Sequence, residues 1–485
     1  MKRIIVIGGG ITGLAAAHRL LERASDLSLT VEILLLEASS RLGGTLQTDF
    51  REGFLLERGP DSFIAEKPWA VRLARRLGID TQLISTNSAH RRSFIVRNGR
   101  LRPVPDGFQL LAPTKVFPFL SSRIFSVGGK ARIAADLLLP RKSINGDKDE
   151  SLADFVRRRF GREALTRMAQ PMVGGIYTAD PEKLSIRATF PRFLEMEHRH
   201  RSIILGLLKA SKTSPASGAR YGLFRTFDRG VQVFVDALVQ RISTFEFRNL
   251  RLPKTFIQLN TTVESLEREK GTTGPSWRVG INSGEAITAD AVCLALPAHV
   301  AARLLSKAAP NLATLLLAIK HASTATINLA YRREEIPHPL DGFGFVVPYV
   351  EKRSLLACTF SSIKFPGRAP AGCALLRAFV GGALQPEMFD LNNEEMISRV
   401  RNDLRDLLRV RKQPLFAEVS KWPDSMPQYE VGHLQHMETI KKALQEFPNL
   451  KVAGNAYDGP GIPDCIRGGE AAAEELIERL SPRES

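Results

Sequence analysis

Six residues near the N-terminus, Gly8-Gly9-Gly10-Ile11-Thr12-Gly13, have the types and the spacing of a turn that binds a dinucleotide. In such a turn the first glycine permits a tight bend, the second lets the backbone approach a pyrophosphate, and the third lets a helix lie close to the sheet. The N-terminus of that helix offers unpaired N–H groups to the phosphates. The pattern therefore predicts that Gly8, Gly10, Ile11, Thr12 and Gly13 bind a cofactor.

The elements around this turn are those that it needs. Residues 3–8 are a short β-branched run, residues 12–23 place small and apolar side chains at helical spacing, and residues 30–37 resemble a second buried strand. Together they make one βαβ unit of about 30 residues, as in a parallel sheet. The second strand ends at Glu37, where a carboxylate can accept hydrogen bonds from a ribose.

A second glycine pair follows in the segment Ser40-Arg41-Leu42-Gly43-Gly44-Thr45. This pair separates FAD enzymes from nicotinamide dehydrogenases, and the segment resembles the flavin amine oxidase and desaturase superfamily. The resemblance implies that Ala38, Arg41, Gly43, Gly44 and Thr45 lie beside the cofactor. The next segment, residues 57–61, resembles the part of the superfamily that passes the isoalloxazine, which implies cofactor contacts from Gly59, Pro60 and Asp61.

Further motifs resemble one family, the protoporphyrinogen and coproporphyrinogen oxidases of haem biosynthesis. The first is Pro-Met-Val-Gly-Gly-Ile-Tyr-Thr-Ala-Asp at residues 171–180, with Leu-Ser-Ile-Arg at residues 184–187. Next come Asp-Gly-Phe-Gly-Phe-Val-Val-Pro at residues 341–348, Thr-Phe-Ser-Ser at residues 359–362, and Trp-Pro through Pro-Gln-Tyr at residues 422–429. The last is Ala-Gly-Asn-Ala-Tyr-Asp-Gly-Pro-Gly-Ile-Pro-Asp-Cys-Ile at residues 453–466.

This resemblance implies an oxygen-dependent oxidation of a porphyrinogen that gives hydrogen peroxide. The hydride passes to flavin N5, so we identify no catalytic side chain, and the residue that accepts the pyrrole protons stays open. FAD is expected to be bound non-covalently, because Gly454 stands where monoamine oxidases carry a flavin-linked cysteine. The resemblance also implies cofactor contacts from Val263, Ala295, Trp422, Gly454, Gly461 and Ile462.

A porphyrinogen is a broad apolar macrocycle with carboxylate arms, so its site should be an apolar slot with cations at the rim. The resemblance implies slot residues Phe343, Gly344, Val346, Phe360 and Ala179, with Arg92 as a rim cation. Two departures matter. Ser93 precedes Phe94 where relatives carry arginine, which leaves the carboxylate-binding cation open, and Ala179 replaces a glycine. The choice between coproporphyrinogen III and protoporphyrinogen IX also stays open.

The chain carries 68 Lys and Arg against 51 Asp and Glu, a net charge of +17. Such a balance favours an anionic partner, which can be a carboxylate-rich substrate, an anionic membrane surface or nucleic acid, while a merely solvated basic surface is the simpler interpretation. We predict no nucleic-acid partner because no binding motif accompanies the charge. The expected partners are the porphyrinogen, O2, a peripheral membrane surface, and a second copy of the chain or ferrochelatase.

Four cysteines, Cys293, Cys358, Cys373 and Cys465, lack any metal-binding or disulfide spacing, so no metal is expected and a reducing cytoplasm fits. No window approaches the roughly 18 uninterrupted apolar residues of a spanning helix. The N-terminus runs directly into the first strand, which is unlike a signal peptide. We therefore predict a cytoplasmic protein with at most peripheral membrane contact.

Strand-like segments recur at residues 289–297 and 450–454, so one sheet draws on the beginning, middle and end of the chain. The predicted fold is α/β (α+β): a discontinuous Rossmann-like FAD-binding domain, an antiparallel-sheet substrate domain and a helical insert. The predicted boundaries are 1–85, 225–305 and 440–485 for the first, 86–105 and 306–439 for the second, and 106–224 for the insert, which can face a membrane.

Two other functions fit the same scaffold. One is an amine oxidase or a carotenoid desaturase, and the other is a non-enzymatic escort that binds prenyl groups or lipids without using flavin. The Gly43-Gly44 pair and residues 454–465 argue against the escort. A yellow purified protein would exclude it.

Overall fold

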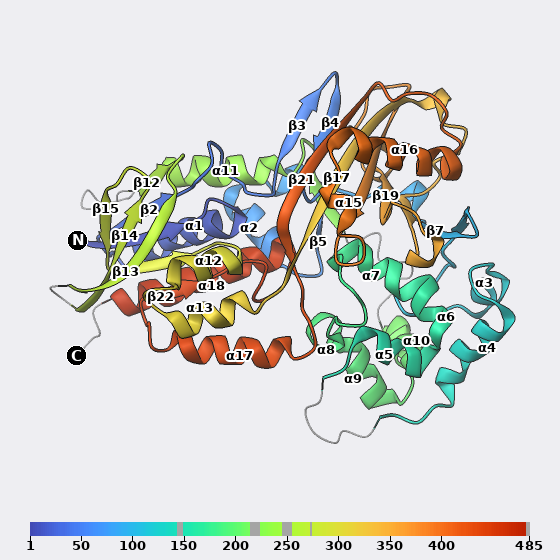
Figure 1. Cartoon of the computed structure of the whole chain (residues 1–485), viewed down its shortest axis with the longest axis horizontal. Helices are drawn as coiled ribbons and strands as arrows, with labels where there is room; N and C mark the ends of the chain where they lie inside the picture. Colours follow the sequence, from blue (N-terminus) through green and yellow to red (C-terminus); the bar gives the residue numbers. More distant parts are fainter. Residues whose placement is uncertain (143–148, 214–223, 245–254, 272–273, 482–485) are drawn as a thin grey trace.

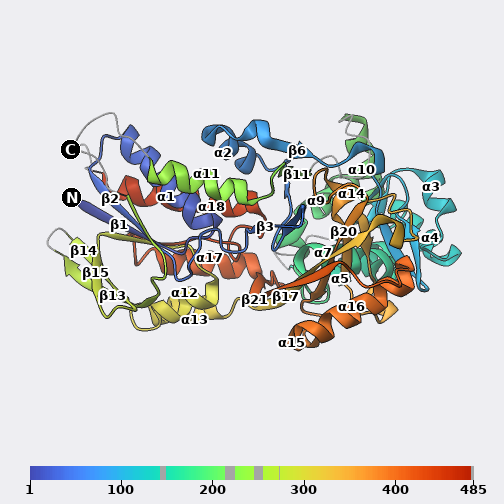
Figure 2. The ribbon, with the colours of Figure 1, turned by 90° about the horizontal axis from the view of Figure 1, so that it is seen from above.

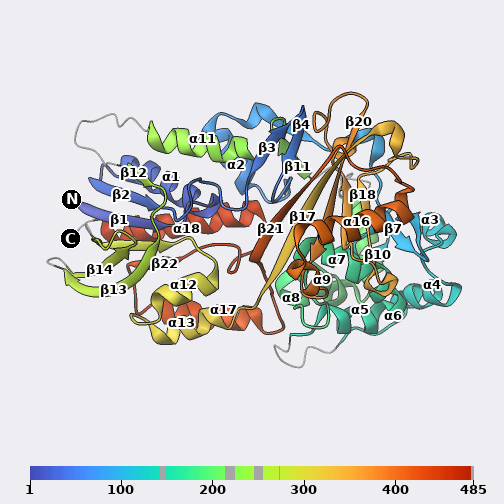
Figure 3. The ribbon, with the colours of Figure 1, turned by 45° about the horizontal axis from the view of Figure 1, so that its top comes forward.

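The computed structural model describes residues 1–142, 149–213, 224–244, 255–271 and 274–481. The molecule is elongated: a parallel sheet and its helices form the lobe at one end, and a group of helices forms the lobe at the other (Figure 1). A second, twisted sheet, in which all neighbouring strands but one pair are antiparallel, lies next to the helical group (Figure 3).

Five parallel strands form the first sheet, in the order β12-β2-β1-β16-β22. The inner strands β1 and β2 are buried along most of their length, as the near-continuous apolar strands of parallel sheets are. The strands come from distant parts of the chain, as the sequence predicts: β1 (Lys2–Ile7), β2 (Val31–Leu36), β12 (Thr255–Gln258), β16 (Ala291–Leu294) and β22 (Leu450–Val452).

Helices cover both faces of this sheet (Figure 2). Ile4 and Val6 of β1 pack towards α1 (Ile11–Asp26), α2 (Trp69–Leu77), α11 (Gln232–Ser243) and α18 (Ile462–Leu480). Ile5 and Ile7 pack towards α12 (Ala298–Leu305), α13 (Pro310–Leu317), α17 (His433–Leu444) and the antiparallel strands β13 (Val263–Gly271), β14 (Gly274–Ile281) and β15 (Ala286–Ala289).

The predicted boundary at residue 306 is wrong. Leu312 and Leu316 of α13 and Met437 of α17 belong to the core beneath the parallel sheet. Both helices therefore pack with the parallel-sheet lobe, although our boundaries placed α13 and most of α17 in the substrate domain. Apolar periodicity can indicate that a segment is helical, but it carries no information about which sheet the helix covers.

The central sheet has seven strands in the order β21-β17-β20-β19-β18-β7-β8. One face is covered by α16 (Asn393–Leu408), whose Met396, Val400 and Leu404 pack on the strands. The strands are β7 (Phe94–Arg97), β8 (Arg100–Pro103), β17 (His321–Arg332), β18 (Gly344–Val346), β19 (Ala357–Phe360), β20 (Cys373–Gly381) and β21 (Phe416–Pro427), with α14 (Ser361–Lys364) and α15 (Glu387–Asp390) between them.

Smaller strands connect the two sheets. The hairpin β3 (Thr48–Arg51) and β4 (Phe54–Glu57) leads into a three-stranded sheet of β5 (Phe63–Ile64), β11 (Phe224–Phe227) and β6 (Leu83–Ser85).

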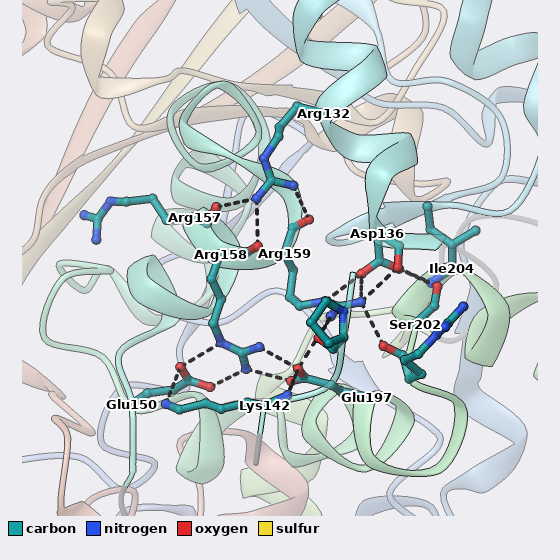
Figure 4. A network of polar contacts seen from close by, with 12 residues as sticks. Arg132, Asp136, Lys142, Glu150, Arg157, Arg158, Arg159, Glu197, Ser202 and Ile204 are labelled. Carbon is teal, nitrogen blue, oxygen red and sulfur yellow. Dashed lines mark hydrogen bonds and ion pairs between the residues drawn. The ribbon is translucent and has the colours of Figure 1, made fainter. Parts of the chain in front are cut away.

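The helical lobe is built around an aromatic core that includes Phe108, Phe125, Phe155 and Phe193. Behind this core, a buried ion pair joins Asp136 to Arg159, whose side chains are 0% and 1% exposed (Figure 4). The elements are β9 (Phe108–Gln109), β10 (Ala112–Pro113), α3 (Val116–Ser121), α4 (Val127–Ala134), α5 (Leu152–Phe160), α6 (Arg162–Ala164), α7 (Gln170–Tyr177), α8 (Ile186–Thr189), α9 (Pro191–His200) and α10 (Ile203–Thr213).

No helix within the described part of the chain is both long enough and apolar enough to cross a membrane.

A buried histidine makes the stability of the parallel-sheet lobe sensitive to pH. Burial lowers the pKa of His18 on α1 to about 4, with nearby arginines lowering it further and Glu22 opposing them. Between pH 6.5 and 4 the unfolded chain therefore binds a proton that the folded chain excludes, so stability falls as the pH falls. We expect a loss of about 2 kcal/mol from His18 between pH 7.5 and 5.

Urea unfolding at both pH values, with His18→Leu as the comparison, measures this effect. The free energy of unfolding of His18→Leu should depend less on pH than that of the wild type. Equal slopes in the two proteins would contradict the assignment.

Candidate functional site

The glycine turn ends β1 and begins α1. Gly8 has a φ of +105°, a conformation that glycine adopts without strain. A Cβ atom on Gly13 would lie 1.9 Å from the carbonyl oxygen of Gly8, so any side chain there would push the helix off the strand. A Cβ atom on Gly10 would meet nothing within 4 Å. The turn thus packs tightly at Gly13 and leaves open space at Gly10.

Two long helices begin with glycine N-caps and no capping side chain. Gly10 precedes Ile11 and the buried Thr12 at the start of α1, and Gly461 precedes Ile462 at the start of α18. The first N–H groups of a helix without a side-chain cap attract anionic oxygens, as does the positive end of the helix dipole. Both helix N-termini therefore suit phosphate or other anionic groups of a cofactor.

Glu37 follows β2 directly and is held in one orientation. Its Oε2 accepts a hydrogen bond from the backbone N–H of Gly9 at 2.6 Å, and its Oε1 accepts bonds from the N–H and hydroxyl of Ser39 at 2.8 and 2.7 Å. The carboxylate is half-buried beside the glycine turn, and the adjacent Ala38 is exposed. This is the position from which a carboxylate can also accept bonds from ribose hydroxyls.

The second glycine pair packs on the first turn. Gly43 forms a bridge with Gly10, and its N–H donates to the carbonyl of Gly9 at 2.8 Å. Gly44 has a φ of +58°, and a Cβ there would lie 3.2 Å from the Cα of Gly10. A Cβ on Gly59 would lie 1.9 Å from the carbonyl oxygen of Thr45. The three segments therefore form one glycine-lined cradle, and this cradle fits a dinucleotide.

Arg41 keeps the loop of this cradle in place. Its guanidinium donates to the carbonyls of Leu42 and Leu46 at 3.0 and 3.3 Å and also to that of Gly44. Partial burial lowers the pKa of Arg41, although Asp49 and Glu37 oppose that shift. The arginine thus presents a half-buried cation next to the predicted phosphate position.

The central sheet binds residues 57–61 through polar side chains on the face opposite α16. We call this the uncovered face because α16 does not cover it. Trp422 Nε1 and Thr326 Oγ1 donate to the carbonyl of Arg58 at 3.0 and 2.7 Å, and Asn328 Nδ2 donates to that of Glu57 at 3.0 Å. Arg377, which is 3% exposed, donates to the carbonyl of Gly59. Sequence reasoning identified Trp422 but missed Asn328 and Arg377, which belong to no motif and face this segment only because the sheet folds over it.

The two carboxylates of this segment, Glu57 and Asp61, are in different electrostatic settings. Burial opposes ionisation of Asp61, but Lys364 Nζ, at 3.0 and 2.9 Å from its two oxygens, together with Arg377 holds the pKa of Asp61 well below its usual range. Burial raises the pKa of Glu57 to about 7, against hydrogen bonds from Thr48 and the N–H of Val231. Asp61 is thus a fixed charge beside Pro60, which is exposed.

The other predicted cofactor residues surround the same cradle. A Cβ on Gly8 would lie 2.4 Å from the carbonyl oxygen of Ala295, so β16 closes one side of the turn. Gly454 follows β22 with a φ of +148°. Val263 is the first residue of β13 and is half-buried. Two residues before it, the N–H of Thr261 donates to the carbonyl of Glu37 at 2.9 Å.

The predicted slot residues do not all lie on one face of the central sheet. Phe360 of β19 is 0% exposed and packs with Phe345 in the core under α16. Side chains alternate along a strand, so the neighbouring Thr359 points to the opposite, uncovered face. We therefore correct the prediction for Phe360: it is a core residue, and Thr359 takes its place as a candidate slot residue.

Val346 of β18 does lie on the uncovered face. It packs against the core of the helical lobe, and its Cγ1 is 3.9 Å from where a Cβ on Gly175 of α7 would lie. β19 separates β18 from β20, which carries Arg377. The face over Thr359 is therefore bordered by the helical lobe on one side and by residues 57–61 on the other.

Phe343 and Gly344 lead into the same strand. Gly344 has a φ of +139°, and a Cβ there would lie 2.1 Å from the carbonyl oxygen of Cys358, so only glycine fits. Phe343 is buried, and its role as a slot residue stays a prediction.

Ala179 and Arg92 lie at the margins of this region. Ala179 is buried after α7 and lines a cavity of about 520 Å³ together with Gly382 and Lys320. Arg92 is exposed, and its guanidinium donates to the carbonyl of Asp341 at 2.6 Å and pairs with the Asp341 carboxylate. A substrate carboxylate would have to share Arg92 with Asp341. The role of Arg92 in substrate binding stays a prediction.

Comparisons with known proteins agree with this geometry. The sequence profile described as flavin containing amine oxidoreductase matches residues 11–477. The coproporphyrinogen III oxidase of Bacillus subtilis (strain 168) is 35% identical, with 99% of this chain and 98% of that protein covered. The chloroplastic protoporphyrinogen oxidase 1 of Arabidopsis thaliana is 30% identical, with 98% and 88% covered. A solved structure from Exiguobacterium sp. 255-15 superposes with a TM-score of 0.85 at 30% identity, over 99% of each chain.

Proposed function

The chain belongs to the flavin-containing amine oxidoreductase family, and on that premise we propose that it oxidises coproporphyrinogen III to coproporphyrin III. It is an FAD-dependent oxidoreductase of the porphyrinogen oxidase type. The choice of coproporphyrinogen III is supported by the 35% identity to the B. subtilis enzyme, against 30% for the chloroplastic protoporphyrinogen oxidase, with nearly full coverage of both chains. The basic balance of the chain also suits a substrate with four propionates.

The overall reaction removes six electrons and six protons and converts three O2 to three H2O2. Bound FAD supplies the hydride acceptor and the contact with O2. The chain positions the reactants: the glycine cradle and the N-termini of α1 and α18 would hold the anionic part of the cofactor, and the central sheet holds residues 57–61 in place next to the cradle. The substrate lies over Thr359 and Val346 of the uncovered sheet face in this proposal.

Turnover with each porphyrinogen tests the substrate. Porphyrin fluorescence should give a kcat/KM at least ten times higher for coproporphyrinogen III than for protoporphyrinogen IX. A reversed preference would reject coproporphyrinogen III while leaving the flavoenzyme assignment intact. A purified protein without flavin absorbance would reject both.

The two faces of β19 allow a sharper test of the slot. Phe360→Ala should cost about 3 to 5 kcal/mol of stability, because it empties a fully buried core position, while kcat/KM per bound FAD stays close to normal. Thr359→Leu should cost little stability, because Thr359 is half-buried, but should raise KM several-fold by narrowing the slot. Unfolding curves and kinetics on both variants measure this. Unchanged kinetics in Thr359→Leu would contradict the slot.

We also propose that the helical lobe touches an anionic membrane surface. Val116, Phe117 and Leu120 of α3 and Val127 of α4 are 72%, 81%, 56% and 84% exposed, near Lys115, Arg123 and Lys130. Large exposed apolar side chains flanked by cations are typical of peripheral membrane contacts. A Phe117→Ser/Val127→Ser variant should sediment less with anionic vesicles than the wild type, and equal sedimentation would contradict the contact. Homodimerisation and a contact with ferrochelatase stay predictions.

A further inference from the structure

A basic hollow in the helical lobe lies outside the site described so far. It has a volume of about 520 Å³ and opens where the C-terminal end of α9, residues 138–141 and α10 meet. Arg141, Arg199, Arg201 and Lys209 line it together with two histidines, and no acidic residue of the described chain does so. Four cations from three segments therefore converge on one space.

A buried network holds these segments in position (Figure 4). Arg159 Nε donates to Asp136 Oδ1 at 2.7 Å, and the same guanidinium donates to the carbonyls of Pro140 and Arg201 at 3.0 and 2.9 Å. Arg201 in turn donates to the carbonyl of Leu137 at 3.0 Å. One fully buried arginine thus binds two of the segments that form the hollow, so its shape is set before any ligand arrives.

The carboxylates nearest to the hollow are already engaged. Glu197 is 4% exposed and accepts bonds from Arg158 at 2.5 and 2.6 Å, and Asp136 accepts bonds from Arg159 and Ser202. Glu195, whose side chain is 55% exposed, pairs with Arg199. The hollow therefore keeps a net positive charge.

Stabilisation of the end of α9 does not account for all four cations of the hollow. Cations in the last turn of a helix stabilise it through the dipole, which accounts for residues 198–200 at the end of α9. Arg141 comes from a separate segment before α9, from which its Nη1 donates to the carbonyl of His198 at 3.4 Å, and Lys209 belongs to α10, a different helix. Arg201, just beyond α9, also has a φ of +65°, which is uncommon for a residue with a side chain.

We propose that this hollow binds a phosphate group, whether free or in the headgroup of an anionic lipid. Guanidinium groups match phosphate oxygens in geometry and charge, and convergent arginines are the usual means of holding them. The inference does not depend on the proposed function, because the hollow lies in the helical lobe, apart from the glycine cradle that holds the flavin.

Isothermal titration of the FAD-loaded protein with inorganic phosphate, at constant ionic strength in chloride, tests the proposal. The wild type should bind one phosphate per chain. Arg141→Gln/Arg199→Gln should bind at least ten times more weakly. The control Arg411→Gln/Lys412→Gln removes the same charge from exposed positions outside the helical lobe and should bind as the wild type does. Melting curves and flavin absorbance establish that all three proteins are folded.

Sedimentation with phosphatidylcholine vesicles, with and without phosphatidylglycerol, separates the two sources of phosphate. If the pocket variant loses both phosphate and phosphatidylglycerol binding, the ligand is a lipid headgroup. If it loses phosphate alone, the ligand is a free phosphate. No phosphate binding to the wild type, or an equal loss in the control variant, overturns the proposal.

Discussion

Replacement of Gly10 by valine should give a folded protein that no longer retains FAD. A Cβ on Gly10 meets nothing within 4 Å, and its backbone has a φ of −70°, so valine costs little in folding. The branched side chain would instead fill the space in front of the N-terminus of α1, which phosphates need to reach the backbone N–H groups. The absorbance ratio of flavin to protein, after purification and after incubation with excess FAD, measures the effect.

Gly13→Ala is the matched control for this result. The added methyl group would lie 1.9 Å from the carbonyl oxygen of Gly8, so the substitution acts on the packing of α1 against β1. We expect it to lower the melting temperature sharply, whereas Gly10→Val should melt close to the FAD-free wild type. Stoichiometric flavin in Gly10→Val would contradict the cradle.

Replacement of Arg159 by methionine should lower the free energy of unfolding by about 3–5 kcal/mol, because it leaves Asp136 charged and buried without its partner. The loss should extend to the chain around Asp136, Pro140 and Arg201, whose carbonyls the same guanidinium binds. Denaturant unfolding followed by circular dichroism measures it.

The neighbouring Arg157 provides the control, since its side chain is 39% exposed and pairs with Glu182 and Asp154 at the surface. Arg157→Met should cost no more than about 1 kcal/mol. A second variant, Arg159→Met/Asp136→Leu, removes both charges and should recover much of the loss. Equal costs for Arg157→Met and Arg159→Met would show that the buried pair contributes no more than a surface pair.

The cofactor cradle could be predicted from the sequence because its chemistry is local. The turn at residues 8–13 and the carboxylate of Glu37 belong to one βαβ unit, in which strand and helix periodicity place each residue. The packing of Gly43 and Gly44 on Gly10 follows from a short connection. Glycine is required at these positions for steric reasons, and such requirements are visible in a sequence.

The slot face could be predicted only in part. The motif at residues 359–362 pointed to β19, and Phe360 was assigned to the slot because it is the larger and more apolar side chain. Strand pairing directs Phe360 into the core instead. A one-residue difference decides which face a side chain occupies, and nothing within the motif states which face is covered. Asn328 and Arg377 were missed for the same reason, because they meet residues 57–61 only across the sheet.

The run Arg157-Arg158-Arg159 shows what the sequence alone does not determine. By type the three are alike, and the net charge of +17 predicted only an anionic partner or a solvated basic surface. The fold makes them different: Arg157 lies at the surface, Arg158 joins Glu150 to Glu197, and Arg159 is buried against Asp136 (Figure 4).

The sequence determined the cofactor turn, the family and the chemistry, because these depend on residue types at short spacing. Only the tertiary structure decided which charges are structural and which face a ligand, because burial and pairing depend on segments far apart in the chain.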